Sequence, residues 1–241
     1  MTEPDPISDP AQPRPTLRER KFARTKLALL STAVERLKEK PLSEITVKEL
    51  CESVRVSEAT FFNYFKKKDD LLHYFIQIWT LDVTLRAREA VGSSAGLAFV
   101  EQVFDLTAQH LAEHPRMMQE IIGHMALEPR PAPCTRECEG ITLAECLQAF
   151  PTVDCVESLP DIRLENLWKP HLERAVELGE LPVTLQLDQA LLALVSTFFG
   201  VPLWLCSGAP ERVRTAYREQ LDLIWAGLRA RAGADPMPAQ S

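Results

Sequence analysis

Apolar residues recur every three or four positions along almost the whole chain, and this spacing constrains the fold more than any other feature. It is the period of an α-helix. The pattern predicts an all-α fold, because no alternation of period two, as half-buried strands require, persists anywhere. Helices are expected at about 17–39, from Thr46, from Ser57, and at about 69–90, 95–112, 115–127, 140–149, 161–179, 187–207 and 210–230.

The composition excludes several classes of protein. The 241 residues are 46% apolar and 25% charged, which is typical of a globular protein. No apolar run approaches the roughly 20 residues that cross a bilayer, and the acidic, proline-rich start MTEPDPISDPAQPRP lacks the order of a secretory signal. We therefore expect a cytoplasmic protein with reduced cysteines and no membrane partner. Without a nucleophile elbow, phosphate loop, HExxH or paired-carboxylate signature, we do not expect an enzyme.

Charge is distributed unevenly along the chain. Residues 17–80 carry 13 Lys and Arg against 9 Asp and Glu, whereas residues 81–241 carry 13 against 22. A basic amino-terminal part on an acidic remainder indicates that one end faces a polyanion.

The segment 45–65, ITVKELCESVRVSEATFFNYF, reads as two short helices joined by a tight turn. Thr46 with Glu49 forms a predicted capping box, and Ser57 is the expected cap of the second helix. A buried wedge of Val47, Leu50, Cys51, Val56, Phe61 and Phe65 would leave Glu58, Ala59, Phe62 and Asn63 on the outer face. An asparagine there can pair bidentately with adenine in the major groove.

With RERKFARTKLALLSTA before it and KKKDDLL after it, this segment resembles the amino-terminal domain of the TetR family of bacterial repressors, over about residues 17–75. The resemblance implies a homodimer on a palindromic double-stranded DNA operator. It also implies DNA contacts from a basic arm (Arg18, Arg20 and Lys21), from Thr46 at the first short helix and from Lys68 after the second. The second short helix would be the recognition helix, with contacts from Ser57, Ala59, Thr60, Phe62, Asn63 and Tyr64.

Three positions depart from the family pattern. Arg55 stands in the turn where glycine is usual, and a left-handed conformation there costs arginine roughly 1 kcal/mol more than glycine. Lys67 replaces a usual cap, so Asp69 is the expected alternative cap. Phe62 replaces a frequent tyrosine, which removes one phosphate hydrogen bond.

The rest of the chain is expected to dimerise and to bind an effector. The last two helices carry more apolar surface than one helix pair buries, so we predict half of an intermolecular four-helix bundle, with an intramolecular core as the alternative. The predicted dimer residues are Leu191, Leu194, Val195, Phe198, Tyr217, Leu221, Ile224 and Trp225.

Histidines and methionines suggest where a small-molecule effector binds, although ordinary core packing would use the same residues. The candidates are His110, Met117, Met118, Ile121, His124, Met125, Trp168 and His171.

Four cysteines fall within 22 residues: Cys134, Cys138, Cys146 and Cys155. Their spacing is not the tight zinc pattern, so packing, a soft metal or a reversible disulfide all remain open. No cofactor is required for the leading hypothesis, in which a small molecule in the carboxyl-terminal domain releases a repressor from DNA. The alternatives are a metal- or redox-responsive regulator using these cysteines and a cysteine-dependent enzyme. The expected divisions are a disordered tail at 1–16, the DNA-binding domain at 17–67, the effector and dimerisation domain at 68–232 and a disordered tail at 233–241.

Overall fold

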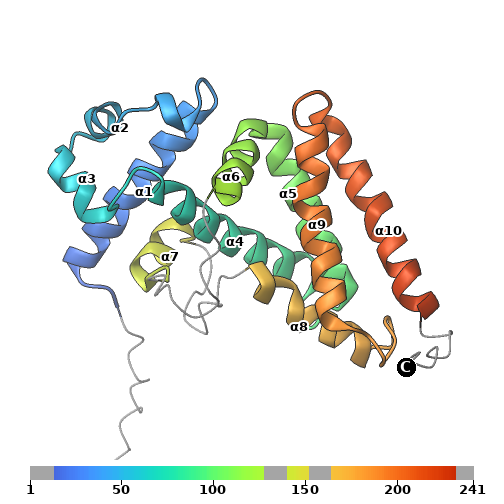
Figure 1. Ribbon diagram of the computed structural model, residues 1–241. Coiled ribbons are helices and arrows are strands. Elements are labelled where there is room, and N and C mark those ends of the chain that lie inside the picture. Colours follow the sequence, from blue (N-terminus) through green and yellow to red (C-terminus); the bar gives the residue numbers. More distant parts are fainter. Residues whose placement is uncertain (1–13, 128–139, 152–163, 232–241) are drawn as a thin grey trace, which may run out of the picture.

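The computed structural model describes residues 14–127, 140–151 and 164–231, and every regular element in those ranges is helical (Figure 1). The elements are α1 (Leu17–Leu37), the short 3₁₀ turn η1 (Leu42–Glu44), α2 (Val47–Val54), α3 (Glu58–Tyr64), α4 (Asp70–Val91), α5 (Leu97–Glu113), α6 (Pro115–Leu127), α7 (Leu143–Ala149), α8 (Leu164–Glu177), α9 (Leu187–Leu205), η2 (Pro210–Arg212) and α10 (Val213–Arg231). The all-α prediction is confirmed.

Helices α1 to α3 form a small amino-terminal unit, which we call the head (residues 17–64). Its core is the predicted wedge: Leu50, Cys51, Phe61 and Phe65 are buried, and Val56 packs partly against them. Buried residues of α1, including Leu29, join the same cluster. The sequence pattern placed these residues correctly because both short helices are strongly one-sided.

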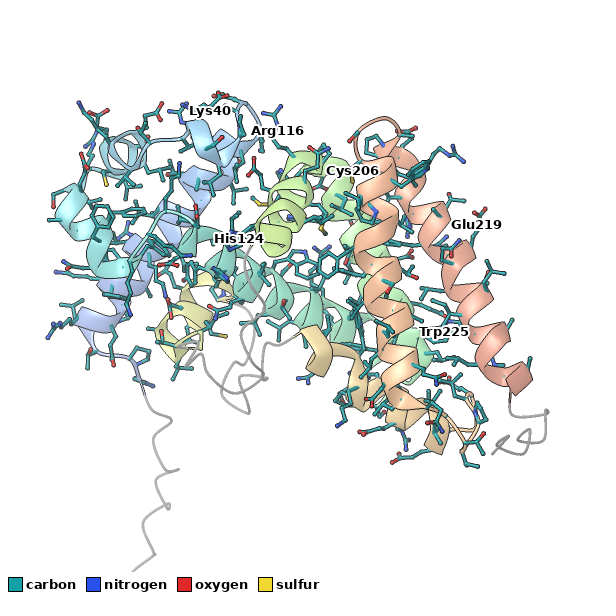
Figure 2. All side chains as sticks on the ribbon, in the orientation of Figure 1. Lys40, Arg116, His124, Cys206, Glu219 and Trp225 are labelled. Carbon is teal, nitrogen blue, oxygen red and sulfur yellow. The ribbon has the colours of Figure 1, made fainter. Side chains whose placement is uncertain are left out.

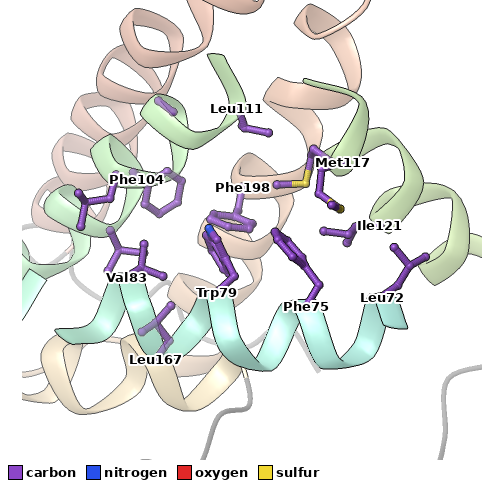
Figure 3. Packing of buried hydrophobic residues seen from close by; sticks show 14 of the residues in the cluster. Leu72, Phe75, Trp79, Val83, Phe104, Leu111, Met117, Ile121, Leu167 and Phe198 are labelled. Carbon is purple, nitrogen blue, oxygen red and sulfur yellow. The ribbon is translucent and has the colours of Figure 1, made fainter. Parts of the chain in front are cut away.

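The remaining helices form a larger unit, which we call the body (from α4 to α10). Helix α4 runs from the head through the body, with α5 packed along it and α9 and α10 on the far side (Figure 1). Aromatic rings of three helices meet in the core: Trp79 of α4 and Phe104 of α5 both contact Phe198 of α9 (Figure 3). The Tyr217 hydroxyl donates to the Phe198 carbonyl at 2.7 Å and ties α10 to α9.

The prediction for the last two helices was wrong about which residues face outward. Five of the eight proposed dimer residues are 3% exposed or less within the single chain, and they fill its own core: Leu194, Phe198, Tyr217, Leu221 and Trp225. Leu191, Val195 and Ile224 are partly buried. Because α9 is apolar on nearly every side, its periodicity could not distinguish the inward stripe from the outward one. On α10 the apolar stripe is clear, but it packs inside the single chain and not against a second copy.

The exposed apolar side chains of α9 and α10 are instead Leu192, Leu203, Trp204 and Leu223, which are 65–86% exposed. Helix α9 is long and apolar enough by composition to cross a membrane, and 22% of that stretch is buried inside the chain. Pro202 does not interrupt α9. It lies in the last turn, and the helix ends three residues later.

Two predicted boundaries also shift. Thr16, expected in a disordered tail, caps α1 through a capping box with Glu19, so an ordered chain begins before residue 17. Asp69 makes no capping hydrogen bond to α4. The Asp70 carboxylate accepts from the Lys67 amide instead, at 3.0 Å.

Candidate nucleic-acid interface

The turn between α2 and α3 is set by local hydrogen bonds that the sequence predicts. Thr46 and Glu49 form the capping box of α2, and the Ser57 hydroxyl accepts from the Thr60 amide at 3.1 Å at the start of α3. Arg55 has φ 60° and ψ 47°, the left-handed conformation expected from its position. The Val56 amide then donates to the Cys51 carbonyl at 3.0 Å, which closes the end of α2.

Helix α3 is anchored on one face and open on the other. Phe61 is fully buried, whereas Glu58, Ala59, Phe62 and Asn63 are exposed; half of the Phe62 surface is accessible. Nothing within the described residues covers this outer face. It therefore has the geometry of a helix that presents an amide, a methyl and an aromatic ring to base edges.

Tyr64 and Thr60 occupy the flanks of α3. The Tyr64 ring lies 4.4 Å from that of Phe22 on α1, so α1 supports the end of α3. The Thr60 hydroxyl lies 2.8 Å from the Ser57 hydroxyl. These two hydroxyls therefore engage each other, and Tyr64 is only partly accessible.

The predicted basic arm is not an extension before the first helix. Arg18, Arg20 and Lys21 all lie in the first two turns of α1, and all three are exposed. At 100° per residue, Arg18 and Lys21 share one side of the helix and Arg20 lies on another. The three charges therefore do not act as one flexible strand.

Lys68 has a structural role that the sequence did not reveal. Its ammonium donates to the carbonyls of Leu42, Ser43 and Ile45 at 2.6, 3.3 and 2.8 Å. A lysine ammonium has three donors, so this set uses all of them. The position does not support the predicted phosphate contact, and Lys68 instead holds η1 and the start of α2 in place.

Thr46 is similarly occupied. Its amide and hydroxyl donate to the Glu49 carboxylate at 2.8 and 3.0 Å. The hydrogen bond from Lys40, followed by those from Thr46, lowers the pKa of Glu49 to about 2. The start of α2 thus already faces a carboxylate, which weakens the expectation that it binds a phosphate. Lys40 lies at the upper end of the head (Figure 2).

The candidate effector residues fall into separate places. Met117 and Ile121 are buried near Phe75 (Figure 3), Met118 is also buried, and His110 lies beside the Phe75 ring. Burial, followed by the nearby His114, lowers the pKa of His110 to about 4, so this imidazole is neutral at pH 7.

His171 of α8 lies beside the start of α5, whereas His110 lies near the end of α5, roughly 20 Å further along that helix. Its Nδ1 is 2.7 Å from the Ala95 carbonyl and its ring stacks on Phe99. Trp168 is fully buried between these two regions. The rings of His124 and His73 are in contact, and the side chain of Met125 lies outside the described residues.

The cysteine cluster is described only at Cys146, which is 1% exposed and disulfide-bonded. Cys134, Cys138 and Cys155 lie outside the described residues, as does the partner of that bond. Cys51, which the sequence placed in the buried wedge, and Cys206 are both free and buried. Within the described ranges, no group of three or more metal-binding side chains is present.

Comparisons with known proteins agree with this geometry. Residues 29–75 match the family model of bacterial regulatory proteins of the tetR family. No curated protein matches the chain.

Several solved structures share the fold. A Thermus thermophilus FadR, described as a TetR-family transcriptional repressor in complex with lauroyl-CoA, is 18% identical with a TM-score of 0.58, covering 90% of this chain and 99% of its own. A Rhodococcus sp. RHA1 protein of unknown function is also 18% identical, with a TM-score of 0.55 and coverage of 85% and 95%.

The TetR-family regulator PfmR, also from Thermus thermophilus, is 21% identical, with a TM-score of 0.50 and coverage of 83% and 98%. These identities establish a shared fold over nearly the whole chain, and the family model covers the helix-turn-helix. Residues 29–75 are thus similar to the DNA-binding segment of tetR-family bacterial regulatory proteins, and the chain as a whole shares its fold with solved structures that include regulators of that family.

Proposed function

We propose that the protein is a homodimeric repressor that leaves a palindromic operator when a small molecule binds its body. The observation that carries this proposal is the open outer face of α3, where Ala59, Phe62 and Asn63 are exposed on a helix anchored by buried Phe61. Arg18 and Lys21 on α1 would contact phosphates beside it. Such a protein acts in the cytoplasm, where the DNA is.

A dimer is needed because one recognition helix contacts too few base pairs for specific binding. The exposed apolar side chains of α9 and α10 support a dimer face there. Leu192 and Leu203 are 11 residues apart, so they share one stripe of α9, and Trp204 lies beside it. A contiguous apolar face of this kind marks an interface in a globular protein.

The body offers an apolar interior with a few polar groups for an effector. Trp168 Nε1 and His110 Nε2 are buried and have no hydrogen-bond partner among the described residues. Buried polar atoms usually have a partner, so a ligand with hydrogen-bonding groups would complete both sites. Met117, Met118 and Ile121 would accommodate its apolar part.

The similarity to the repressor in complex with lauroyl-CoA favours an acyl chain as that apolar part. Ligand binding would stabilise a second arrangement of the two heads, and the difference in affinity between the arrangements would release the DNA. A coupling of 1–3 kcal/mol changes operator occupancy by roughly 5- to 150-fold.

The test is fluorescence anisotropy with the full chain and labelled DNA from the regions flanking its own gene, followed by addition of acyl-CoA thioesters of several lengths. We expect binding to one palindromic segment at physiological salt and release by a subset of the thioesters. A folded dimer that distinguishes no segment from scrambled DNA would refute the DNA-binding role. Binding without release by any thioester would refute only the acyl effector.

A redox-responsive regulator is the second candidate, because Cys146 is disulfide-bonded. In that case two thiols would lose two electrons and two protons to an oxidant such as a peroxide, which is reduced to water. Operator affinity would then differ between the reduced and oxidised forms of the wild type. In Cys146→Ser, oxidation would leave operator affinity unchanged. Equal affinities of the two wild-type forms would eliminate this candidate.

A further inference from the structure

Helix α7 lies between the head and the body (Figure 1). One side of it packs on α1 of the head. Its other side joins a small apolar cluster in which Ile141 and Cys146 surround Leu81 of α4, with Leu147 and Phe150 packed against them. A seven-residue helix therefore contacts both parts of the molecule at once.

An ion pair fixes α7 to the head. Lys26 Nζ of α1 lies 2.6 Å from Glu145 Oε1, and the two side chains are 16% and 1% exposed. The same ammonium lies 4.1 Å from the centre of the Tyr74 ring on α4. Three helices, α1, α4 and α7, thus converge on one cation in a place from which water is nearly excluded.

The Glu145 carboxylate also stabilises α7 itself. Its second oxygen accepts from the Thr142 amide at 2.8 Å and from the Thr142 hydroxyl at 2.7 Å, as the capping box requires. Burial by itself raises the pKa of Glu145, but the contacts with Lys26 and Thr142 outweigh it, so the pKa lies below its ordinary value. The group is therefore a buried carboxylate whose charge depends on α1 remaining in contact.

A buried ion pair of this kind confers geometric specificity more than stability. Separating the partners leaves an uncompensated charge in an apolar place, which is strongly unfavourable, whereas replacing both is often tolerated. Rotation of the head away from α7 would expose one of these charges to water or leave it buried without its partner. Few relative positions of head and body are compatible with the intact pair.

We propose that α7, through Lys26 and Glu145, is a clip that holds the head in one orientation on the body and thereby sets the affinity for DNA. This inference rests on the proposed DNA-binding function. The ion pair is formed in this arrangement of head and body. We take this arrangement as the one that pairs with an operator, so loss of the ion pair lowers operator affinity. Lys26 and Glu145 act as positioning residues and need no contact with DNA.

The test compares Lys26→Met and Glu145→Gln with a matched control, Lys38→Met. Lys38 is the C-cap of α1 and pairs with Glu35 of the same helix, and both of those side chains are largely exposed. The control therefore removes the same charge from the same helix without touching the clip. Hydrogen exchange of α1 and α7 and operator affinity are measured on the full-length protein.

We expect both clip variants to exchange at least tenfold faster in α1 and α7 than the control and to bind the operator more than tenfold more weakly. Lys26→Met/Glu145→Gln should bind no more weakly than the weaker single variant, because the two changes remove one interaction. This double variant also keeps the test decisive if a single variant fails to fold.

Three results would overturn the proposal: exchange within twofold of the control, faster exchange with operator affinity equal to the control, or multiplicative losses in the double variant. Exchange is measured without DNA. A failure of all forms, wild type included, to bind any operator would therefore count against the proposed function and leave exchange to decide whether the clip holds α1.

Discussion

Arg55→Gly is expected to stabilise the protein. Arg55 is the only residue other than glycine with a positive φ in the described part of the chain, at φ 60° and ψ 47°, and its side chain is exposed. This conformation costs an L-residue with a Cβ roughly 1–2 kcal/mol, and glycine avoids that cost. The greater freedom of glycine in the unfolded chain offsets about 0.5–1 kcal/mol of this gain.

The net gain is therefore about 0.5–1 kcal/mol, or a rise in Tm of roughly 1–4 °C for a chain of this size. The assay is thermal unfolding followed by circular dichroism at one fixed protein concentration, because the Tm of a dimer depends on concentration.

Arg55→Ala is the matched control, since it removes the same side chain but keeps the Cβ and its cost. The Arg55→Gly protein should be more stable than the Arg55→Ala protein by the same net amount, about 0.5–1 kcal/mol, and Arg55→Asn should fall between them because asparagine tolerates this region. An Arg55→Gly protein no more stable than Arg55→Ala would refute the reasoning from backbone strain.

Three further outcomes follow from the packing, from a shifted pKa and from the exposed face. Gly96→Ala should destabilise the protein by about 1–3 kcal/mol in urea unfolding, because a Cβ would come within 2.9 Å of the Ala175 Cα; Gly123→Ala, in open space, is the control, and equal effects would contradict the crowding argument. The pKa of Glu49 is lowered to about 2, so its stabilising contribution is complete above about pH 4.5 and is lost as the pH falls toward 2. Glu49→Gln should therefore flatten the pH dependence of unfolding in that window, and an unchanged slope would count against the Lys40 and Thr46 contacts. Trp204→Asp should yield monomers in light scattering, whereas Val183→Asp, an equally exposed change outside α9 and α10, should not; a dimeric Trp204→Asp protein would show that the interface lies elsewhere.

The head was predictable because its signals are local. The capping box of α2, the Ser57 cap of α3, the one-sided short helices and the turn at Arg55 each depend on residues within a few positions of one another, so the sequence alone specified them. The outward face of α3 followed from the same periodicity, with Phe61 inward and Asn63 outward.

The body was predictable only in outline. Its helices were found close to their bounds, but the direction of each face depended on partners distant in the sequence. Phe198 faces inward because it packs against Trp79 of α4 and Phe104 of α5, and nothing in the evenly apolar helix α9 shows this. Trp225 faces inward because α10 lies against α5.

Polar contacts between segments distant in the sequence could not be predicted either. Lys68 reads as one of three consecutive lysines, yet its ammonium donates to the carbonyls of the segment that follows α1. Lys26 and Glu145 lie on helices whose contact has no counterpart in local spacing. Such pairs are set by the tertiary fold, and sequence periodicity does not record them.

The most direct test of the central claim is the ratio of affinities for operator and scrambled DNA, measured at one salt concentration for the wild type and Asn63→Ala, with Ser53→Ala on exposed α2 surface as the control. If the outer face of α3 contacts base edges, the ratio for Asn63→Ala should fall by about 5- to 150-fold, the equivalent of 1–3 kcal/mol of lost discrimination, while non-specific binding stays near the wild-type level. An unchanged ratio, with operator recognition intact, would contradict the assignment of α3 as the helix that recognises DNA.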